Sequence, residues 1–64
     1  MSKRPPIIEM YVDGAREYRW RIVAGNGEII GDSAESYRHR GDCEHSARLV
    51  APDAPIRFID PPLA

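Results

Sequence analysis

The sequence predicts a small α+β protein in which a three-stranded antiparallel meander carries one short helix on one face. Two patterns predict this fold. Residues 17–24 place apolar side chains on one face and mostly charged side chains on the other, with the period of two that is typical of a half-buried strand. Residues 42–51 carry apolar side chains at helical spacing and are followed by Pro52. A length of 64 residues allows one domain.

The meander is expected to contain two short turns. Asp13-Gly14-Ala15 forms the first turn signal, and Gly25-Asn26-Gly27 supplies residues that accept the positive φ of a tight hairpin. The three strands are therefore expected at residues 7–12, 16–24 and 28–32.

The helix is expected to begin near Asp42, whose side chain can cap free backbone N–H groups, and to end near Ala51. A last short strand is expected at residues 56–60. Because it follows a connector that contains two prolines, it could exchange with a second copy of the chain or pair as an edge strand within its own chain. The domain is expected to span residues 7–60, with a disordered leader at 1–6 and a tail at 61–64.

The core is expected where the apolar strand face meets the apolar stripe of the helix. Large aromatic side chains supply the buried area that a small domain lacks, although an aromatic face could also stack a ligand. The expected core residues are Ile8, Met10, Tyr18, Trp20, Ile22, Ala47, Val50 and Phe58.

Size and composition favour self-association. A chain this short is marginal as an isolated monomer, and Cys43, the only cysteine, excludes a disulfide within the chain, so a homodimer is expected. The formal charge of -1 argues against a general nucleic-acid binder. No stretch has the length of about 20 apolar residues that a membrane span needs, and the absence of a recognisable targeting segment favours a cytoplasmic protein.

The second face of the meander is the candidate binding surface. If the helix covers only one face, Arg19 and Arg21 lie on an open face that could receive nucleic acid, an acidic protein or a small phosphorylated ligand. The alternative is a solvated face with cross-strand Glu/Arg pairing. The candidate binding residues, here or in an inter-subunit pocket, are Tyr11, Arg16, Arg19, Arg21, Tyr37 and Arg38.

The sequence contains few residues that could bind a metal ion or act as a nucleophile. His39, Cys43 and His45 lie close in sequence, but no second cysteine supports a structural metal site, and no cofactor or metal is expected. Cys43 falls on the apolar stripe of the helix, where a small core residue is expected rather than an exposed thiolate. The sequence therefore offers no catalytic residues and does not predict an enzyme.

The residues from Tyr18 to Ile22, from Asn26 to Ile30, and at Ser33 and Tyr37 resemble the YegP-like family of small uncharacterised proteins. The resemblance covers most of residues 7–60. It implies a β-β-β-α-β unit that, when present once per chain, forms a homodimer by exchanging its last strand, and it implies no known activity. The chain departs from the family pattern at the start of the helix, where His39-Arg40 replaces the usual Ser-Lys.

The expected function is that of a non-enzymatic, homodimeric binding or interaction module. The first alternative is a protein that sequesters a small anionic ligand or nucleotide in an Arg-lined pocket between subunits. The last alternative, which no motif favours, is an enzyme that uses Cys43 and a histidine.

Overall fold

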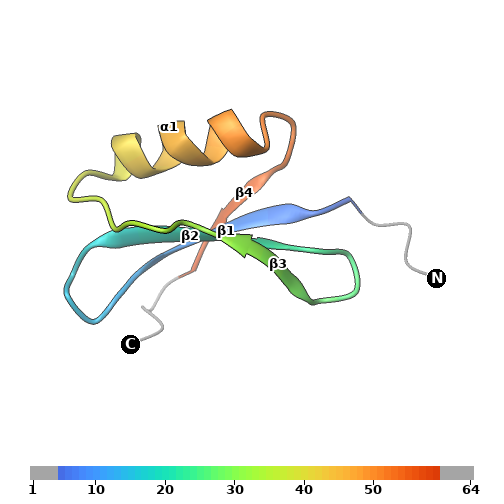
Figure 1. Ribbon diagram of the computed structural model, residues 1–64, viewed down its shortest axis with the longest axis horizontal. Helices are drawn as coiled ribbons and strands as arrows, with labels where there is room; N and C mark the ends of the chain where they lie inside the picture. The colour runs from blue at the N-terminus through green and yellow to red at the C-terminus, as the bar shows by residue number, and fades with distance from the viewer. Residues whose placement is uncertain (1–4, 60–64) are drawn as a thin grey trace.

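The computed structural model describes residues 5–59 and shows an α+β fold in which one helix lies over one face of a four-stranded sheet (Figure 1). Residues 1–4 of the expected leader, Asp60 and the expected tail lie outside the described residues. In chain order the elements are β1 (Ile7–Val12), β2 (Tyr18–Val23), β3 (Ile29–Asp32), α1 (Arg40–Val50) and β4 (Ile56–Phe58).

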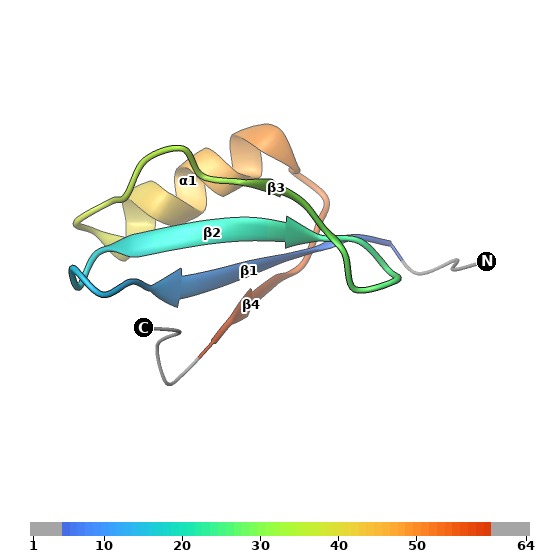
Figure 2. The same ribbon diagram turned by 60° about the horizontal axis from the view of Figure 1, so that its bottom comes forward.

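The sheet is mixed, with the strand order β3-β2-β1-β4. β1, β2 and β3 pair antiparallel as expected, whereas β4 runs parallel to β1 and extends the sheet by a fourth strand (Figure 2). The prediction of a purely three-stranded antiparallel sheet is therefore wrong. The reason is that α1 carries the chain back across the sheet to the end where β1 begins, as a crossover helix between parallel strands does.

The turns shorten the expected strands. β2 begins at Tyr18 rather than at residue 16, because Arg16 adopts a left-handed backbone conformation (φ 64°) within the β1–β2 turn. The β2–β3 hairpin closes with hydrogen bonds from Ala24 N–H to the Glu28 carbonyl (2.8 Å) and from Gly27 N–H to the Ala24 carbonyl (2.9 Å). Gly27 has φ 91°, so a residue without a Cβ is favoured at this position.

The helix begins earlier than expected. His39, in an extended conformation, is the N-cap, so Asp42 lies within the first turn and not at the cap. A carboxylate there still interacts favourably with the positive end of the helix dipole. The expected end is confirmed, because α1 ends at Val50 and the Ala51 N–H donates to the Ala47 carbonyl at 2.9 Å.

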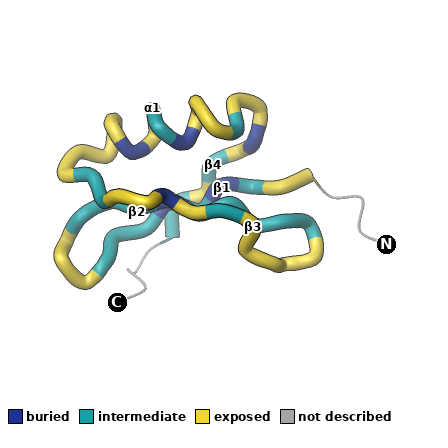
Figure 3. The backbone as a smooth tube through the Cα atoms, in the orientation of Figure 1, coloured by how far each residue is buried: buried dark blue, intermediate teal, exposed yellow. Residues whose placement is uncertain are grey.

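The core lies between α1 and the two central strands (Figure 3). Its buried residues are Ile8, Met10, Trp20, Cys43, Ala47 and Ala54. Among the other expected core residues, Tyr18, Ile22 and Phe58 are half-buried against this cluster.

Val50 is the exception, because its side chain is 59 % exposed. Cys43, Ala47 and Ala51 face the sheet at a spacing of four residues. Val50 precedes Ala51 by one residue, which is a rotation of about 100° around the helix axis, so its side chain points away from the sheet. The prediction that Val50 belongs to the core is wrong within the single chain. The adjacent Leu49 is 72 % exposed, so the last turn of α1 presents two large aliphatic side chains to solvent.

Candidate functional site

The sheet face opposite α1, here called the open face, is the candidate site. Because side chains alternate along a strand, β1 directs Ile8 and Met10 into the core and Ile7, Glu9 and Tyr11 to the open face. The open face comprises Ile7, Glu9, Tyr11, Arg19, Arg21, Val23, Ile29, Asp32 and Arg57.

Strand register aligns four charged residues of the open face across the whole sheet. Arg21 is paired with Asp32 of β3 and with Glu9 of β1, and Glu9 is paired with Arg57 of β4. Read from β3 to β4, this charged row is Asp32, Arg21, Glu9 and Arg57. Its charges alternate in sign from one edge of the sheet to the other.

The centre of the charged row is a close ion pair. The Nε and Nη2 atoms of Arg21 both lie 2.7 Å from Oε1 of Glu9, and the two side chains are only 25 % and 13 % exposed. The guanidinium of Arg21 also lies 5.4 Å from the centre of the Tyr11 ring. Cross-strand pairs of this kind contribute about 0.2–1 kcal/mol. Glu9 and Arg21 therefore form the cross-strand Glu/Arg pair that the sequence offered as an alternative to a binding role.

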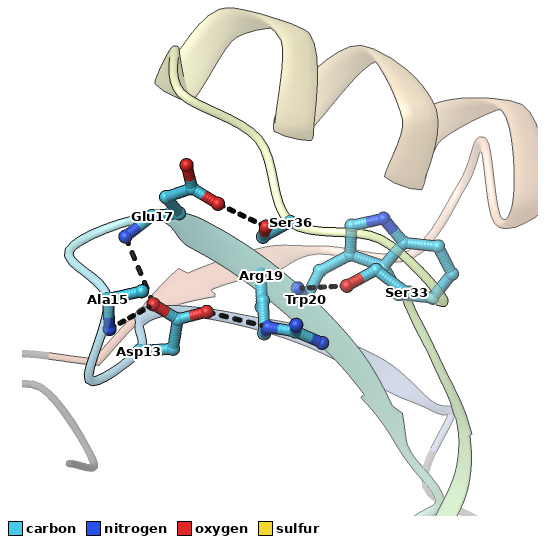
Figure 4. Close-up of polar contacts among 7 residues, drawn as sticks. All are labelled: Asp13, Ala15, Glu17, Arg19, Trp20, Ser33 and Ser36. Carbon is cyan, nitrogen blue, oxygen red and sulfur yellow. Dashed lines mark hydrogen bonds and ion pairs between the residues drawn. The ribbon is translucent and has the colours of Figure 1, made fainter.

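Arg19 is held by Asp13, a residue to which the sequence patterns gave no role beyond a turn. Arg19 Nε donates to Asp13 Oδ2 at 2.7 Å, while Asp13 Oδ1 accepts the N–H groups of Ala15 (2.8 Å) and Glu17 (3.1 Å) (Figure 4). The hydrogen bond from Arg19, followed by that from the Glu17 N–H, lowers the pKa of Asp13 below 3.8. Asp13 in turn raises the pKa of Arg19. One carboxylate thus orders the β1–β2 turn and fixes the arginine.

This geometry predicts a specific acid dependence of stability. Because the folded-state pKa of Asp13 is depressed, its contribution is fully present above the unfolded value of 3.8 and is lost as the pH falls through the folded-state pKa. The difference in unfolding free energy between the unmodified chain and Asp13→Asn should therefore shrink below about pH 4. Urea unfolding at several pH values measures it, and a difference that stays constant down to about pH 2 would contradict the role of Asp13.

The remaining candidate binding residues do not join the open face. Arg16 lies in the β1–β2 turn, and Arg38 is exposed in the segment between β3 and α1. Tyr37 forms a two-way backbone bridge with Tyr18, with N···O distances of 2.7 and 2.9 Å, and it packs against the core on the α1 side. Within one chain, the structure therefore gathers Tyr11, Arg19 and Arg21 but separates them from Tyr37 and Arg38.

Two residues of the family resemblance, Ser33 and Tyr37, fasten the segment between β3 and α1 to β2. The Ser33 hydroxyl accepts the Trp20 N–H at 3.2 Å, and the Ser33 N–H donates to the Trp20 carbonyl at 2.8 Å (Figure 4). Ser36, in the same segment, donates a short hydrogen bond to the Glu17 carboxylate, which lies just before β2. These contacts explain the motif residues as structural, since they close the side of the core beside Trp20.

Cys43 is fully buried, and burial raises the pKa of its thiol to about 11. A thiol in this state is a poor nucleophile at neutral pH, because the thiolate is the reactive form. Within residues 5–59, no three or more His, Cys, Asp or Glu side chains come together in a way that could hold a metal ion. No helix in the same range is long and apolar enough to cross a membrane.

Alkylation of Cys43 should accordingly be controlled by unfolding. At about pH 8, we expect iodoacetamide to modify the native chain far more slowly than the chain in urea, because the folded thiol is buried and protonated. Intact-mass spectrometry over time measures both rates. Modification of the native chain at the rate of the denatured chain would show that the thiol is accessible.

The open face has a hollow at the end nearest the β2–β3 turn. It has a volume of about 240 Å³, and it is lined by Pro5, Ile7, Glu9, Val23, Ala24, Gly25, Gly27 and Arg57. Ile7 and Val23 are paired in register, and Ile29 of β3, which pairs with Val23, is 57 % exposed. Apolar side chains thus border the charged row on this side.

The part of the chain that the structure describes is a small α+β domain in which α1 covers one sheet face and no other element covers the open face. The family described as Domain of unknown function (DUF1508) matches residues 13–57. A UPF0339 protein of Neisseria meningitidis serogroup B is 43 % identical over 43 residues, which is 67 % of this chain and 75 % of the relative. A UPF0339 protein of Treponema denticola is 39 % identical over 52 residues, which is 77 % of this chain and 88 % of the relative.

The chain belongs to the DUF1508 family, whose UPF0339 members are the YegP-like proteins that its sequence resembles. The solution structure of a protein from Haloferax volcanii, determined by NMR, has a similar fold, with a TM-score of 0.69 and 37 % sequence identity. The similarity covers 84 % of this chain and 95 % of that protein.

Proposed function

We propose that this chain is a non-enzymatic interaction module that acts as a homodimer and binds protein through its open face. The observation that carries the proposal is that no element within residues 5–59 covers the open face, while its two central arginines already have carboxylate partners, Glu9 and Asp13. A free anion would have to compete with these carboxylates for the guanidinium groups. A protein surface can instead be matched to the existing alternation of charges.

The composition of the open face fits the same role. Protein interfaces are enriched in aromatic residues and arginine and carry apolar side chains at their centres. Tyr11, Arg19 and Arg21 supply the first kind of residue, and Ile7 and Val23 supply the second. All five are only partly exposed, so their side chains are already restrained, and ordering them on binding costs less conformational entropy.

The homodimer is proposed to form by exchange of β4. Opening the connector between α1 and β4 would break the hydrogen bonds from Arg48 Nη1 to the carbonyls of Pro52 (3.3 Å) and Ala54 (2.7 Å), at about 1 kcal/mol each. Leu49 and Val50, in the last turn of α1 just before this connector, are exposed in the single chain and are available for burial in a dimer. Burying such side chains fully is worth about 1.5–3 kcal/mol each, so the exchange can be favourable.

An isotope-filtered NMR experiment tests the exchange directly. In a refolded mixture of labelled and unlabelled chains, we expect NOEs between Ile8 of one chain and Ile56 of another, because these residues are paired neighbours in the sheet. Intermolecular NOEs at this pair would support the exchange. NOEs restricted to single chains, together with a mass of 7.2 kDa in solution, would show that β4 stays in its own chain and that the protein is a monomer.

A ligand screen separates protein binding from the alternative of a small anionic ligand. Any ligand that binds the folded state raises the unfolding midpoint. We expect ATP and inorganic phosphate to shift the midpoint no more than sodium chloride at the same ionic strength. A larger shift with ATP that disappears in Arg21→Gln would favour the anionic ligand.

A further inference from the structure

The order of signs along the charged row has a symmetry that the single ion pair between Arg21 and Glu9 does not show. From β3 to β4 its signs are negative, positive, negative and positive, at Asp32, Arg21, Glu9 and Arg57. Read in the opposite direction, from β4 to β3, the signs are positive, negative, positive and negative. Each position of the reversed row therefore carries the opposite sign to the same position of the original row. A row of this kind is complementary to its own reversed copy.

A two-fold axis produces this reversal when two open faces meet. The axis runs parallel to the strands, midway between the two sheets and above the gap between β1 and β2. It places Asp32 opposite Arg57 of the second copy and Arg21 opposite Glu9 of the second copy. A two-fold axis that runs along the row would instead place each charge opposite itself, with four like-charged contacts. The charge pattern thus selects one orientation for two open faces that meet.

The neighbouring positions of the open face fit the same orientation. Tyr11 and Arg19 form the next register pair on the open face, beside the pair of Glu9 and Arg21. Arg19 of each copy would therefore meet the Tyr11 ring of the other copy. Ile7 and Val23 are paired one step in the other direction, so the apolar side chains would meet each other. Two sheets that pack face to face keep their strands within about 30° of each other, as this axis requires.

We propose that the open face binds the open face of a second copy of this chain, with the two sheets related by the two-fold axis parallel to their strands. This inference rests on the proposed use of the open face for protein binding and names the partner. The contact holds whether β4 belongs to its own chain or to an exchanged partner, because the charged row has the same order in both cases.

Charge reversal at the two ends of the row tests this contact. Asp32 and Arg57 are both exposed and lie on the two edge strands, so their substitution leaves the core unchanged. Asp32→Arg places two arginines opposite each other, and Arg57→Glu places two carboxylates opposite each other. The double variant Asp32→Arg/Arg57→Glu reverses both ends and restores complementarity, with the same net charge as the unmodified chain.

Sedimentation velocity at about 20 mM salt supplies the readout, because screening is weak at that ionic strength. We expect each single variant to sediment with half the mass of the unmodified chain and the double variant to recover the full mass. Arg38→Glu and Glu44→Arg serve as controls, since both residues are exposed outside the open face, and they should leave the mass unchanged.

Two results would overturn the proposal. The first is an equal mass for the unmodified chain, both single variants and the double variant. The second is a loss of mass in the single variants that the double variant does not reverse, which would indicate an interface with another geometry or partner. Circular dichroism of each variant confirms that the fold is retained.

The exchange of β4 is tested independently of this contact. The NOEs between Ile8 and Ile56 depend on backbone pairing and should be the same in the single variants as in the unmodified chain. Intermolecular NOEs without any effect of the charge reversals would leave the exchanged dimer standing and reject the open-face contact. NOEs restricted to single chains, together with a loss of mass in the single variants and its recovery in the double variant, would reject the exchange of β4 and leave the open-face contact standing.

Discussion

Replacing Trp20 with alanine is expected to lower the free energy of unfolding by about 3–5 kcal/mol. The indole is only 6 % exposed, and its backbone is paired with Met10 at the centre of the sheet. Its Nε1–H also donates to the Ser46 hydroxyl of α1 at 2.6 Å, so the side chain connects the sheet to the helix by packing and by a hydrogen bond. Small single-core domains have about 3–5 kcal/mol of stability in total, and we expect the variant to be largely unfolded.

Trp20→Phe separates the two contributions of this side chain. Phenylalanine keeps most of the apolar contact with the core but cannot donate to Ser46, so a loss smaller than that of the alanine variant is expected. Urea unfolding followed by circular dichroism measures both variants. If Trp20→Ala unfolded within about 1 kcal/mol of the unmodified chain, the indole could not be the main link between sheet and helix.

Met10→Ala is expected to lower the free energy of unfolding by about 2–5 kcal/mol. Met10 is fully buried on the central strand β1, where it pairs with Trp20 on one side and Phe58 on the other. Shortening this side chain leaves a cavity between two aromatic residues and the helix. Because Phe58 belongs to β4, the loss of Met10 should also weaken the docking of that strand.

Met10→Leu is the matched control, because leucine has a similar volume and should cost less than about 1.5 kcal/mol. Amide exchange at Ile59, whose N–H donates to the Met10 carbonyl at 2.8 Å, reports on β4 separately from global unfolding. A Met10→Ala variant as stable as Met10→Leu would show that the core does not depend on contacts at this position.

The alternation in residues 17–24 predicted the division of β2 correctly, because a period of two fixes which side chains share a face. Trp20 faces α1, while Arg19 and Arg21 lie on the open face. Local patterns were sufficient here because each strand keeps its own alternation whatever it pairs with. The helix, its end near Ala51 and the antiparallel pairing of the first three strands follow from equally local signals.

The errors arise where a position depends on the tertiary arrangement. Val50 is the last residue of α1 and Ala51 is its C-cap, and the rotation of the helix about its own axis decides that Ala51 rather than Val50 is turned inwards. The parallel pairing of β4 with β1 likewise follows from the path of α1 across the sheet. Neither the rotation of the helix nor the strand order is encoded in the spacing of apolar residues.

The features of the open face could be predicted only in part. The pairing of Glu9 with Arg21 was an available alternative, since both residues lie on the charged side of adjacent strands. The role of Asp13 depends on a turn that folds its carboxylate back onto Arg19, and the charged row depends on the register of four strands at once. These arrangements appear only when residues far apart in the sequence are placed side by side.

The salt dependence of the mass of the unmodified chain tests the central claim, the contact between two open faces, most directly. Charge pairs across this interface should weaken as the Debye length falls from about 20 Å at 20 mM salt to about 4 Å at 500 mM. Sedimentation velocity should therefore show the mass falling by half over this range, while the unfolding midpoint changes little. A mass that is the same at both salt concentrations would contradict the account.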